Sequence, residues 1–301
     1  MTNRLSPRSG LLWAGVALAL MVWHASPDAV SQSAGPGHPA AAALSVGILP
    51  GAVPALPPSA DGADGAGSTD SAAAPSVRPA KVVPQVGAVF ATVDGRPTEH
   101  FCTAAVVDSP GRNVLVTAAH CVVAPGRASA EEAAGSGDSL LFVPGYHDGR
   151  RPFGTWAVTR VVADPRWWRG GDPDFDVAFL TTRPLNGGKP VEQAVGAEGV
   201  AFEPHWHGPV EAVGYPRTGE RPVICANRLI GFGLDQAQFP CRGMTGGTSG
   251  SPLLAAVGPD GRGTVVGAIG GYQAGGLTAD LSYSPGFGQD VEALYRAASL
   301  G

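Results

Sequence analysis

Short apolar runs separated by turn-forming residues dominate the chain from about residue 82 onward. Val, Thr, Ala and Phe gather in these runs, and Gly, Pro, Asp and Asn stand between them. Such runs are typical of β-strands in a sandwich or barrel. Examples are residues 86–90, 103–107, 114–116, 158–162, 177–180, 210–213 and 264–269. The body of about 215 residues is therefore predicted to be all-β, too long for one small barrel and long enough for two.

One helical pattern appears, at the end of the chain. Within residues 290–299, Val291, Leu294 and Tyr295 recur at the spacing of one helix face. Asp290 stands where its side chain can cap the helix start. A short C-terminal helix is therefore predicted.

Residues 31–84 have a different composition. Gly, Pro and Ala make up 29 of the 50 residues from Ser31 to Ala80, which include no aromatic residue. Such a stretch buries too little apolar surface to offset its ordering entropy. We predict a disordered linker or pro-segment here, with processing near Gln85–Val86.

Residues 1–30 have the pattern of an export signal. Arg4 and Arg8 precede the apolar run 11–23. This run of about 13 residues suits a signal peptide and is shorter than the roughly 20 residues of a membrane span. We predict a cleaved signal peptide and a secreted protein that has no membrane association after signal removal. An uncleaved membrane anchor is the alternative.

Cysteine usage and charge narrow the class of protein further. Four cysteines, all in the body, form an even set that an oxidising compartment would pair. Their spacing does not choose among the three possible connectivities. The net charge of −5 argues against a basic nucleic-acid-binding surface. His205 and His207 lack a further ligand nearby, so no metal site is predicted, and no cofactor is implied.

Three segments supply the groups that acyl transfer needs. A serine hydroxyl needs an adjacent base, and the base needs an acid that fixes its tautomer. His120 follows a predicted strand in the string TAAHC at residues 117–121. Asp176 opens an apolar strand in DVAFL at residues 176–180, and Asp174, which would share its strand face, stays an alternative. Ser249 lies among glycines in GGTSGSP at residues 246–252, where the backbone can approach a substrate closely.

Together these strings closely resemble the histidine, aspartate and serine segments of the chymotrypsin-like (trypsin-fold) serine peptidases. They occur in the chain order of that family, and the resemblance spans residues 86–299. The Gly-x-Ser-Gly-Ser-Pro form of the serine loop is similar to that of bacterial secreted glutamyl-endopeptidase-like members. An α/β-hydrolase is disfavoured, because its catalytic residues occur in the chain order Ser, acid, His.

The resemblance implies two six-stranded antiparallel β-barrels with a closing helix, a polypeptide substrate and a monomer. It implies that His120 is the base, Asp176 the acid and Ser249 the nucleophile. The N–H groups of Gly247 and Ser249 would form the oxyanion hole. It also implies the disulfides Cys102–Cys121 and Cys225–Cys241.

The chain departs from the family at the substrate pocket and near the acid. Gly243 stands where trypsin-like members carry an aspartate, and Met244 and Ile269 replace the Thr and His of glutamyl endopeptidases. Thr248 replaces the aspartate that receives a new N-terminus in zymogen-activated members. Residues 268–272 offer neither the serine that many members bond to the acid nor the tryptophan that follows it. We predict an uncharged, non-trypsin-like pocket bordered by Gly243, Met244, Thr245, Ala268, Ile269, Gly270 and Gly271.

The main hypothesis is a secreted serine endopeptidase. Its predicted parts are a signal peptide at 1–30, a linker or pro-segment at 31–84, an N-terminal barrel at 85–190, and a C-terminal barrel with the helix at 191–301. The alternative is a catalytically weak or inactive secreted binding protein on the same fold. An esterase with the same triad would differ only in its leaving group.

Overall fold

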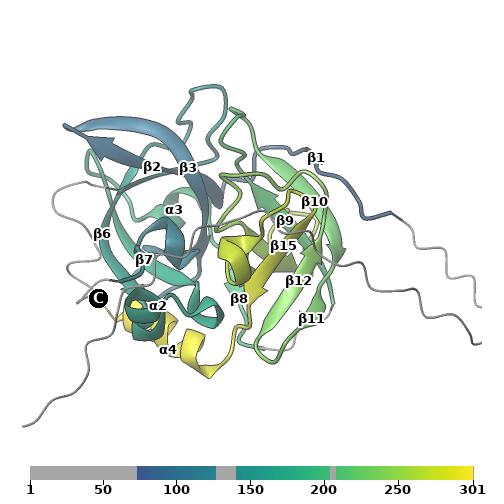
Figure 1. Ribbon diagram of the computed structural model, residues 1–301. Helices are drawn as coiled ribbons and strands as arrows, with labels where there is room; N and C mark the ends of the chain where they lie inside the picture. Colours follow the sequence, from purple (N-terminus) through teal and green to yellow (C-terminus); the bar gives the residue numbers. More distant parts are fainter. Residues whose placement is uncertain (1–72, 127–139, 204–207, 301) are drawn as a thin grey trace, which may run out of the picture. The chain divides into compact units, whose positions relative to one another are not determined.

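The computed structural model describes residues 73–126, 140–203 and 208–300 (Figure 1). The predicted signal peptide, residues 31–72 of the predicted linker, and His205 and His207 lie outside the described residues. Within those three described ranges, no helix is long and apolar enough to cross a membrane.

The first half of the body is a closed barrel of six strands in the order β2-β3-β4-β7-β6-β5. All neighbouring strands are antiparallel. The strands are β2 (Val86–Val93), β3 (Arg96–Val107), β4 (Val114–Thr117), β5 (Leu140–Pro144), β6 (Trp156–Ala163) and β7 (Ala178–Pro184). Asp94 and Gly95 turn β2 into β3 with φ values of 52° and 75°, which is the conformation that favours Asp-Gly in tight hairpins. The first predicted barrel is confirmed.

The second half contains two sheets and no closed ladder among the described strands. A six-stranded sheet has the order β1-β10-β9-β13-β14-β8, and a three-stranded sheet has the order β11-β12-β15. The strands are β1 (Arg78–Pro79), β8 (Gly199–Val200), β9 (Pro209–Gly214), β10 (Val223–Arg228), β11 (Ile230–Phe232), β12 (Gln236–Pro240), β13 (Pro252–Ala255), β14 (Thr264–Ala268) and β15 (Leu281–Pro285). Where β14 meets β15, the Ser284 hydroxyl accepts the Ala268 N–H at 3.1 Å. A side chain therefore takes the place of a ladder bond, and the second six-stranded barrel is not confirmed.

Short helices interrupt the predicted all-β body. They are α2 (Pro165–Gly170), α3 (Val191–Val195) and α4 (Gln289–Ser299), with the 3-10 turns η1 (Ala119–Cys121), η2 (Pro173–Phe175) and η3 (Tyr272–Gly275). Helix α2 was not predicted, although the Asp164 side chain caps its start by accepting the Arg166 N–H. Trp167 and Trp168 of this helix are buried. The apolar period is too short in α2 and α3 to be seen along the sequence.

The predicted C-terminal helix is confirmed as α4, which packs against β6 and β7 (Figure 1). Val291, Leu294 and Ala298 are its buried residues. The Tyr295 hydroxyl donates to the Asp108 carbonyl oxygen at 2.7 Å. The predicted Asp290 cap is wrong, because Gly288 is the N-cap and no side chain caps this end. The Asp290 carboxylate instead pairs with Arg166 at 3.0 Å.

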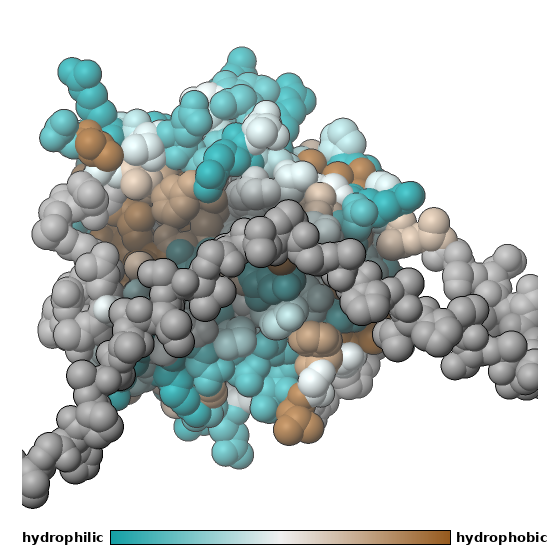
Figure 2. Space-filling model, in the orientation of Figure 1, coloured by the Kyte–Doolittle hydropathy of each residue, from teal (hydrophilic) through white to brown (hydrophobic). Residues whose placement is uncertain are grey.

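Three apolar clusters form the core, and one of them joins the two halves. It brings Val86 and Phe179 of the barrel together with Val213 and Leu254 of the second half. The other two clusters each contain one disulfide. The disulfides Cys102–Cys121 and Cys225–Cys241 have the connectivity that the resemblance implied. On the face drawn in Figure 2, hydrophilic residues predominate and exposed apolar residues gather in separate patches.

The end of the predicted linker is part of the folded body. The Val77 N–H donates to the Arg242 carbonyl oxygen at 2.8 Å, and the Arg242 N–H donates to Pro75 at the same distance. Strand β1 then pairs with β10. We call residues 75–80 the N-terminal strap. The predicted linker boundary at residue 84 is therefore not supported, because residues 75–80 hydrogen bond and pair with the second half.

Processing near Gln85–Val86 is also inconsistent with the fold. Gln85 is buried, its side-chain amide donates to the Val195 carbonyl at 2.6 Å, and its own carbonyl accepts the Val106 N–H at 2.9 Å. A protease therefore has no access to this bond in the folded protein.

Glu198, a residue with a buried carboxyl group, links the first barrel to the six-stranded sheet. The backbone of Glu198 exchanges hydrogen bonds with Val106 and Asp108 of β3 and the loop after it, both at 2.9 Å. Its Oε2 accepts the Gly263 N–H at 2.6 Å, whereas Oε1 has no partner among the described residues. Burial, the largest cause, raises the pKa of the Glu198 carboxyl from its usual 4.5 to about 7.

This carboxyl should make the protein less stable as the pH rises. Between pH 4.5 and 7 the unfolded chain releases the Glu198 proton and the folded chain keeps it, so the free energy of unfolding falls through this window and levels off above it. The expected loss is on the order of 3 kcal/mol. The variant Glu198→Gln should lack this slope in thermal and urea unfolding measured from pH 4 to 8. Exposed Glu203→Gln is the control, and parallel curves for wild type and Glu198→Gln would contradict the prediction.

Candidate active site

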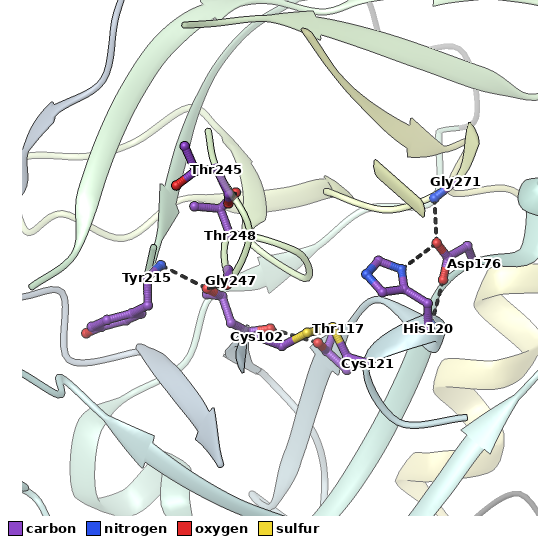
Figure 3. Close-up of a disulfide and its surroundings, with 11 residues drawn as sticks. Cys102, Thr117, His120, Cys121, Asp176, Tyr215, Thr245, Gly247, Thr248 and Gly271 are labelled. Atoms are coloured by element: carbon purple, nitrogen blue, oxygen red, sulfur yellow. Dashed lines mark hydrogen bonds and ion pairs between the residues drawn. A yellow bond between two sulfur atoms is a disulfide. The ribbon is translucent and has the colours of Figure 1, made fainter. Parts of the chain in front are cut away.

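His120 and Asp176 meet at the end of the first barrel, as Figure 3 shows. His120 lies in η1 directly after β4, and Asp176 ends η2 directly before β7. Strands β4 and β7 are paired neighbours, so their adjoining ends bring the two residues together. The distance from His120 Nδ1 to Asp176 Oδ2 is 2.7 Å, and the His120 backbone N–H donates to Asp176 Oδ1 at 2.8 Å.

The exposures of this pair differ in the way that proton transfer requires. The Asp176 side chain is fully buried, whereas the His120 side chain is 20% exposed. In Figure 3 the imidazole lies between Asp176 and the loop that carries Gly247 and Thr248. A carboxylate on Nδ1 favours the tautomer in which Nδ1 carries the proton, and Nε2 is then free to act as a base.

A backbone group bonds the acid at the position where the sequence offers no serine. The Gly271 N–H donates to Asp176 Oδ2 at 2.9 Å. A Cβ built on the neighbouring Gly270 would lie 2.6 Å from the Asp176 carbonyl oxygen. Glycine is therefore needed for this approach, and Asp176 accepts three hydrogen bonds despite the missing hydroxyl.

The nearby carboxylates have other partners. Asp174 Oδ1 accepts the Gln236 side-chain N–H at 2.6 Å, and Asp172 Oδ1 accepts the Asp174 N–H at 3.2 Å. The 3-10 turn η2 breaks the strand alternation that we used to keep Asp174 as an alternative. It turns Asp176, and not Asp174, toward His120.

The serine loop is fastened to the end of the first barrel. The Ser249 carbonyl accepts the Thr103 N–H at 2.8 Å, and Ser249 is half-buried. Gly250 follows with a φ of +81°, and a Cβ there would lie 2.1 Å from the Thr103 carbonyl oxygen and 2.2 Å from Thr117 Oγ1. Since Thr117 is three residues before His120, this contact brings the loop beside the histidine segment.

The backbone donors predicted for an oxyanion hole have no competing acceptor in the described part of the chain. Gly247 and Ser249 donate no hydrogen bond there, whereas the N–H groups of Thr248 and Gly250 are both used within the fold. Gly247 has a φ of +101°. Its carbonyl oxygen accepts the Thr103 hydroxyl at 3.0 Å, which orients this peptide. Thr103 has no distinctive motif around it, so sequence reasoning missed it.

The residues predicted to border the pocket divide into three groups. Met244, Ala268 and Ile269 pack in the apolar core with exposures of 5%, 0% and 3%. Thr245 is exposed, and Gly243 is half-buried. A Cβ on Gly243 would lie 2.7 Å from Val77 Cγ2, so the N-terminal strap supplies an apolar side chain at this position. Gly270 and Gly271 are buried beside Asp176.

One group of potential metal ligands occurs among the described residues, and it includes His120. Atoms of His120, Cys102 and Cys121 lie within 4.8 Å of one another. The two sulfurs form a disulfide, so they are not thiolate ligands.

Comparison with known proteins identifies the fold family. The profile of the trypsin-like peptidase domain matches residues 102–267, which is more than half of the chain. The chain belongs to the trypsin-like peptidase family. The first closed barrel, the β-rich second half and the paired His120 and Asp176 are consistent with this family, and the protein is a serine endopeptidase.

Solved structures agree with the family assignment. The trypsin-like peptidase is similar to the protease Anisep from Arthrobacter nicotinovorans, with 25% identity, a TM-score of 0.62, and coverage of 75% of this chain and 100% of Anisep. It is also similar to AL20, a thermostable serine protease from an extremophilic microorganism, with 27% identity, a TM-score of 0.61, and coverage of 72% and 98%. A Glu endopeptidase shares the fold at 16% identity and a TM-score of 0.55, covering 75% and 98%. No curated protein sequence matches the chain significantly.

Proposed function

We propose that this trypsin-like peptidase is secreted and cleaves polypeptides through a triad of His120, Asp176 and Ser249. The observation that carries the proposal is the pair of hydrogen bonds from His120 to the buried Asp176, at 2.7 and 2.8 Å. A histidine fixed in this way on a partly exposed edge, beside a glycine-rich serine loop, has the arrangement of a general base.

The reaction follows from these groups in two halves. Ser249 Oγ attacks the carbonyl carbon of the scissile bond while His120 Nε2 takes its proton, and Asp176 stabilises the imidazolium. The N–H groups of Gly247 and Ser249 bind the oxyanion, and each such donor typically contributes about 3 kcal/mol to transition-state stabilisation. His120 then protonates the leaving amine. Water, deprotonated by His120, hydrolyses the acyl-enzyme and restores Ser249.

The proposed primary pocket is uncharged. Gly243 carries no side chain, and Val77 lies against it where a charged residue would have to project. A medium apolar or small substrate side chain fits such a surface, whereas an arginine or lysine would leave its charge unpaired. The Gly-x-Ser-Gly-Ser-Pro form of the protein's serine loop is similar to that of glutamyl-endopeptidase-like members. Its pocket residues do not match theirs, so we propose no preference for glutamate.

Secretion is supported by two features. The signal-like pattern precedes the body, and the body contains two disulfides, which persist in oxidising compartments. We propose that the mature protein keeps the N-terminal strap and is processed before Pro75, because the strap hydrogen bonds with Arg242 within the fold.

Covalent labelling tests the triad. A fluorophosphonate probe should label the wild-type protein at Ser249, as located by mass spectrometry, because only an activated serine reacts quickly. Labelling should disappear in Ser249→Ala and His120→Ala. Ser251→Ala is the matched control, since this serine lies two residues away with its hydroxyl buried and should leave labelling intact.

Folded wild-type protein that resists the probe would overturn the proposal and favour a binding protein on the same fold. Digestion of a peptide library with wild-type enzyme that reacts with the probe tests the specificity of the pocket. Cleavage after apolar or small residues is expected, and dominant cleavage after Arg, Lys or Glu would contradict the uncharged pocket.

A further inference from the structure

One buried carboxamide connects the two turns that surround Asp176. Gln236 opens β12 and is only 9% exposed. Its Nε2 donates to Asp174 Oδ1 at 2.6 Å, and its Oε1 accepts the Tyr272 N–H at 2.8 Å. Asp174 belongs to η2 and Tyr272 to η3. The carboxamide thus supplies a donor to the carboxylate in η2 and an acceptor to the backbone N–H in η3.

Both partners of Gln236 lie close in sequence to Asp176 or to a residue that hydrogen bonds to it. Asp174 stands two residues before Asp176 in the same turn. Tyr272 follows Gly271, whose N–H donates to Asp176 Oδ2 at 2.9 Å. Gln236 therefore sets the separation between the turn that carries the carboxylate and the backbone donor that binds it.

The turn η3 needs such an external support. Gln273 and Ala274 have φ values of 54° and 53°, in the left-handed region that L side chains rarely adopt. Gly271 itself has a φ of +82°, and a Cβ on it would lie 2.6 Å from Gln236 Oε1. The carboxamide packs directly against the glycine whose N–H reaches Asp176. The surrounding bonds, rather than the local preference of the chain, determine where this N–H points.

We propose that Gln236 is a positioning residue for the catalytic acid, which holds η2 and η3 so that the Gly271 N–H binds the Asp176 carboxylate. The inference rests on the proposed function, because it assigns Gln236 to the orientation of the same triad. The Gln236 side chain hydrogen bonds to Asp174 and Tyr272 and not to the triad itself, so its effect passes through Asp176 to the orientation of His120.

A charge-swap cycle tests this role. In Gln236→Glu the new carboxylate still accepts the Tyr272 N–H but faces the Asp174 carboxylate without a proton between them. We expect kcat to fall about 10- to 100-fold, as is typical when a partner of a functional group is removed, with a smaller change in KM. The double variant Asp174→Asn/Gln236→Glu restores both hydrogen bonds, because the asparagine amide donates to the glutamate. We expect its kcat to return to within about threefold of that of Asp174→Asn, the single variant that completes the cycle.

The controls separate positioning from general damage. Gln238→Glu introduces the same charge two residues along β12 and should leave kcat within about twofold. Thermal unfolding of every variant shows which of them are folded. If Gln236→Glu does not fold, Gln236→Met replaces it, because methionine keeps the volume and forms neither hydrogen bond.

The possible outcomes are distinct. A folded Gln236→Glu or Gln236→Met with the kcat of Gln238→Glu would overturn the inference, and so would a folded double variant as slow as Gln236→Glu. In both cases fluorophosphonate labelling of wild-type Ser249 would still support the triad. Loss of the proposed function has a different signature, since wild-type protein would then resist the probe altogether.

Discussion

Replacement of Asp176 by asparagine should lower kcat by about three to four orders of magnitude without unfolding the protein. Asp176 accepts three N–H groups through two oxygens, with His120 N–H on Oδ1 and both His120 Nδ1–H and Gly271 N–H on Oδ2. An asparagine has only one acceptor oxygen. Its amide group would face either the His120 or the Gly271 backbone N–H, or would force the imidazole proton onto Nε2, where the ring cannot act as a base.

Steady-state kinetics on a peptide substrate would measure this effect, with thermal unfolding as the check on the fold. Asp172→Asn is the matched control, because Asp172 caps η2 and asparagine is an equally good cap. A kcat for Asp176→Asn within tenfold of that of Asp172→Asn would show that Asp176 is not the acid of the triad.

Gly250→Ala should damage both stability and activity. Gly250 has a φ of +81°, and an added Cβ would lie 2.1 Å from the Thr103 carbonyl oxygen and 2.2 Å from Thr117 Oγ1. The left-handed conformation costs an alanine roughly 1–2 kcal/mol, and overpacking typically costs about 1–3 kcal/mol more, so a loss of about 2–5 kcal/mol is expected. The loop can relieve the clash only by moving Ser249 away from the histidine segment.

Urea unfolding and the rate of fluorophosphonate labelling would report the two effects separately. Gly246→Ala is a suitable folding control on the same loop, since a Cβ there meets nothing within 4 Å. It should leave the free energy of unfolding nearly unchanged. Wild-type stability together with a wild-type labelling rate in Gly250→Ala would refute the close packing of this loop on the first barrel.

The sequence was most informative where short contiguous strings carry a family resemblance. The segments around His120, Asp176 and Ser249 are compact motifs, and the resemblance that they carry predicted both disulfides correctly. Five of the six strands of the first barrel were visible as short apolar runs bounded by turn residues such as Asp94 and Gly95, whereas β5 was not among the predicted runs.

Other features could not be predicted, because they depend on groups that leave no mark on the sequence. Every residue except proline has a backbone N–H, so nothing indicated that Gly271 would replace a missing hydroxyl. Gln236 lies 62 residues from Asp174 and 36 from Tyr272, and only folding brings these three together. The N-terminal strap has too few apolar residues to show a strand period, since its order comes from its pairing partner.

The two ends of the body cross over to opposite halves. The N-terminal strap pairs with β10 in the second half, while α4, the last of the described elements, covers β6 and β7 of the first barrel. During synthesis the first barrel therefore leaves the ribosome before α4 has been made, and its apolar flank stays uncovered until then. A nascent chain that lacks α4 should be recognised by chaperones and degraded readily. Proteolytic activity should accordingly arise only after α4 has been made and has packed on the first barrel.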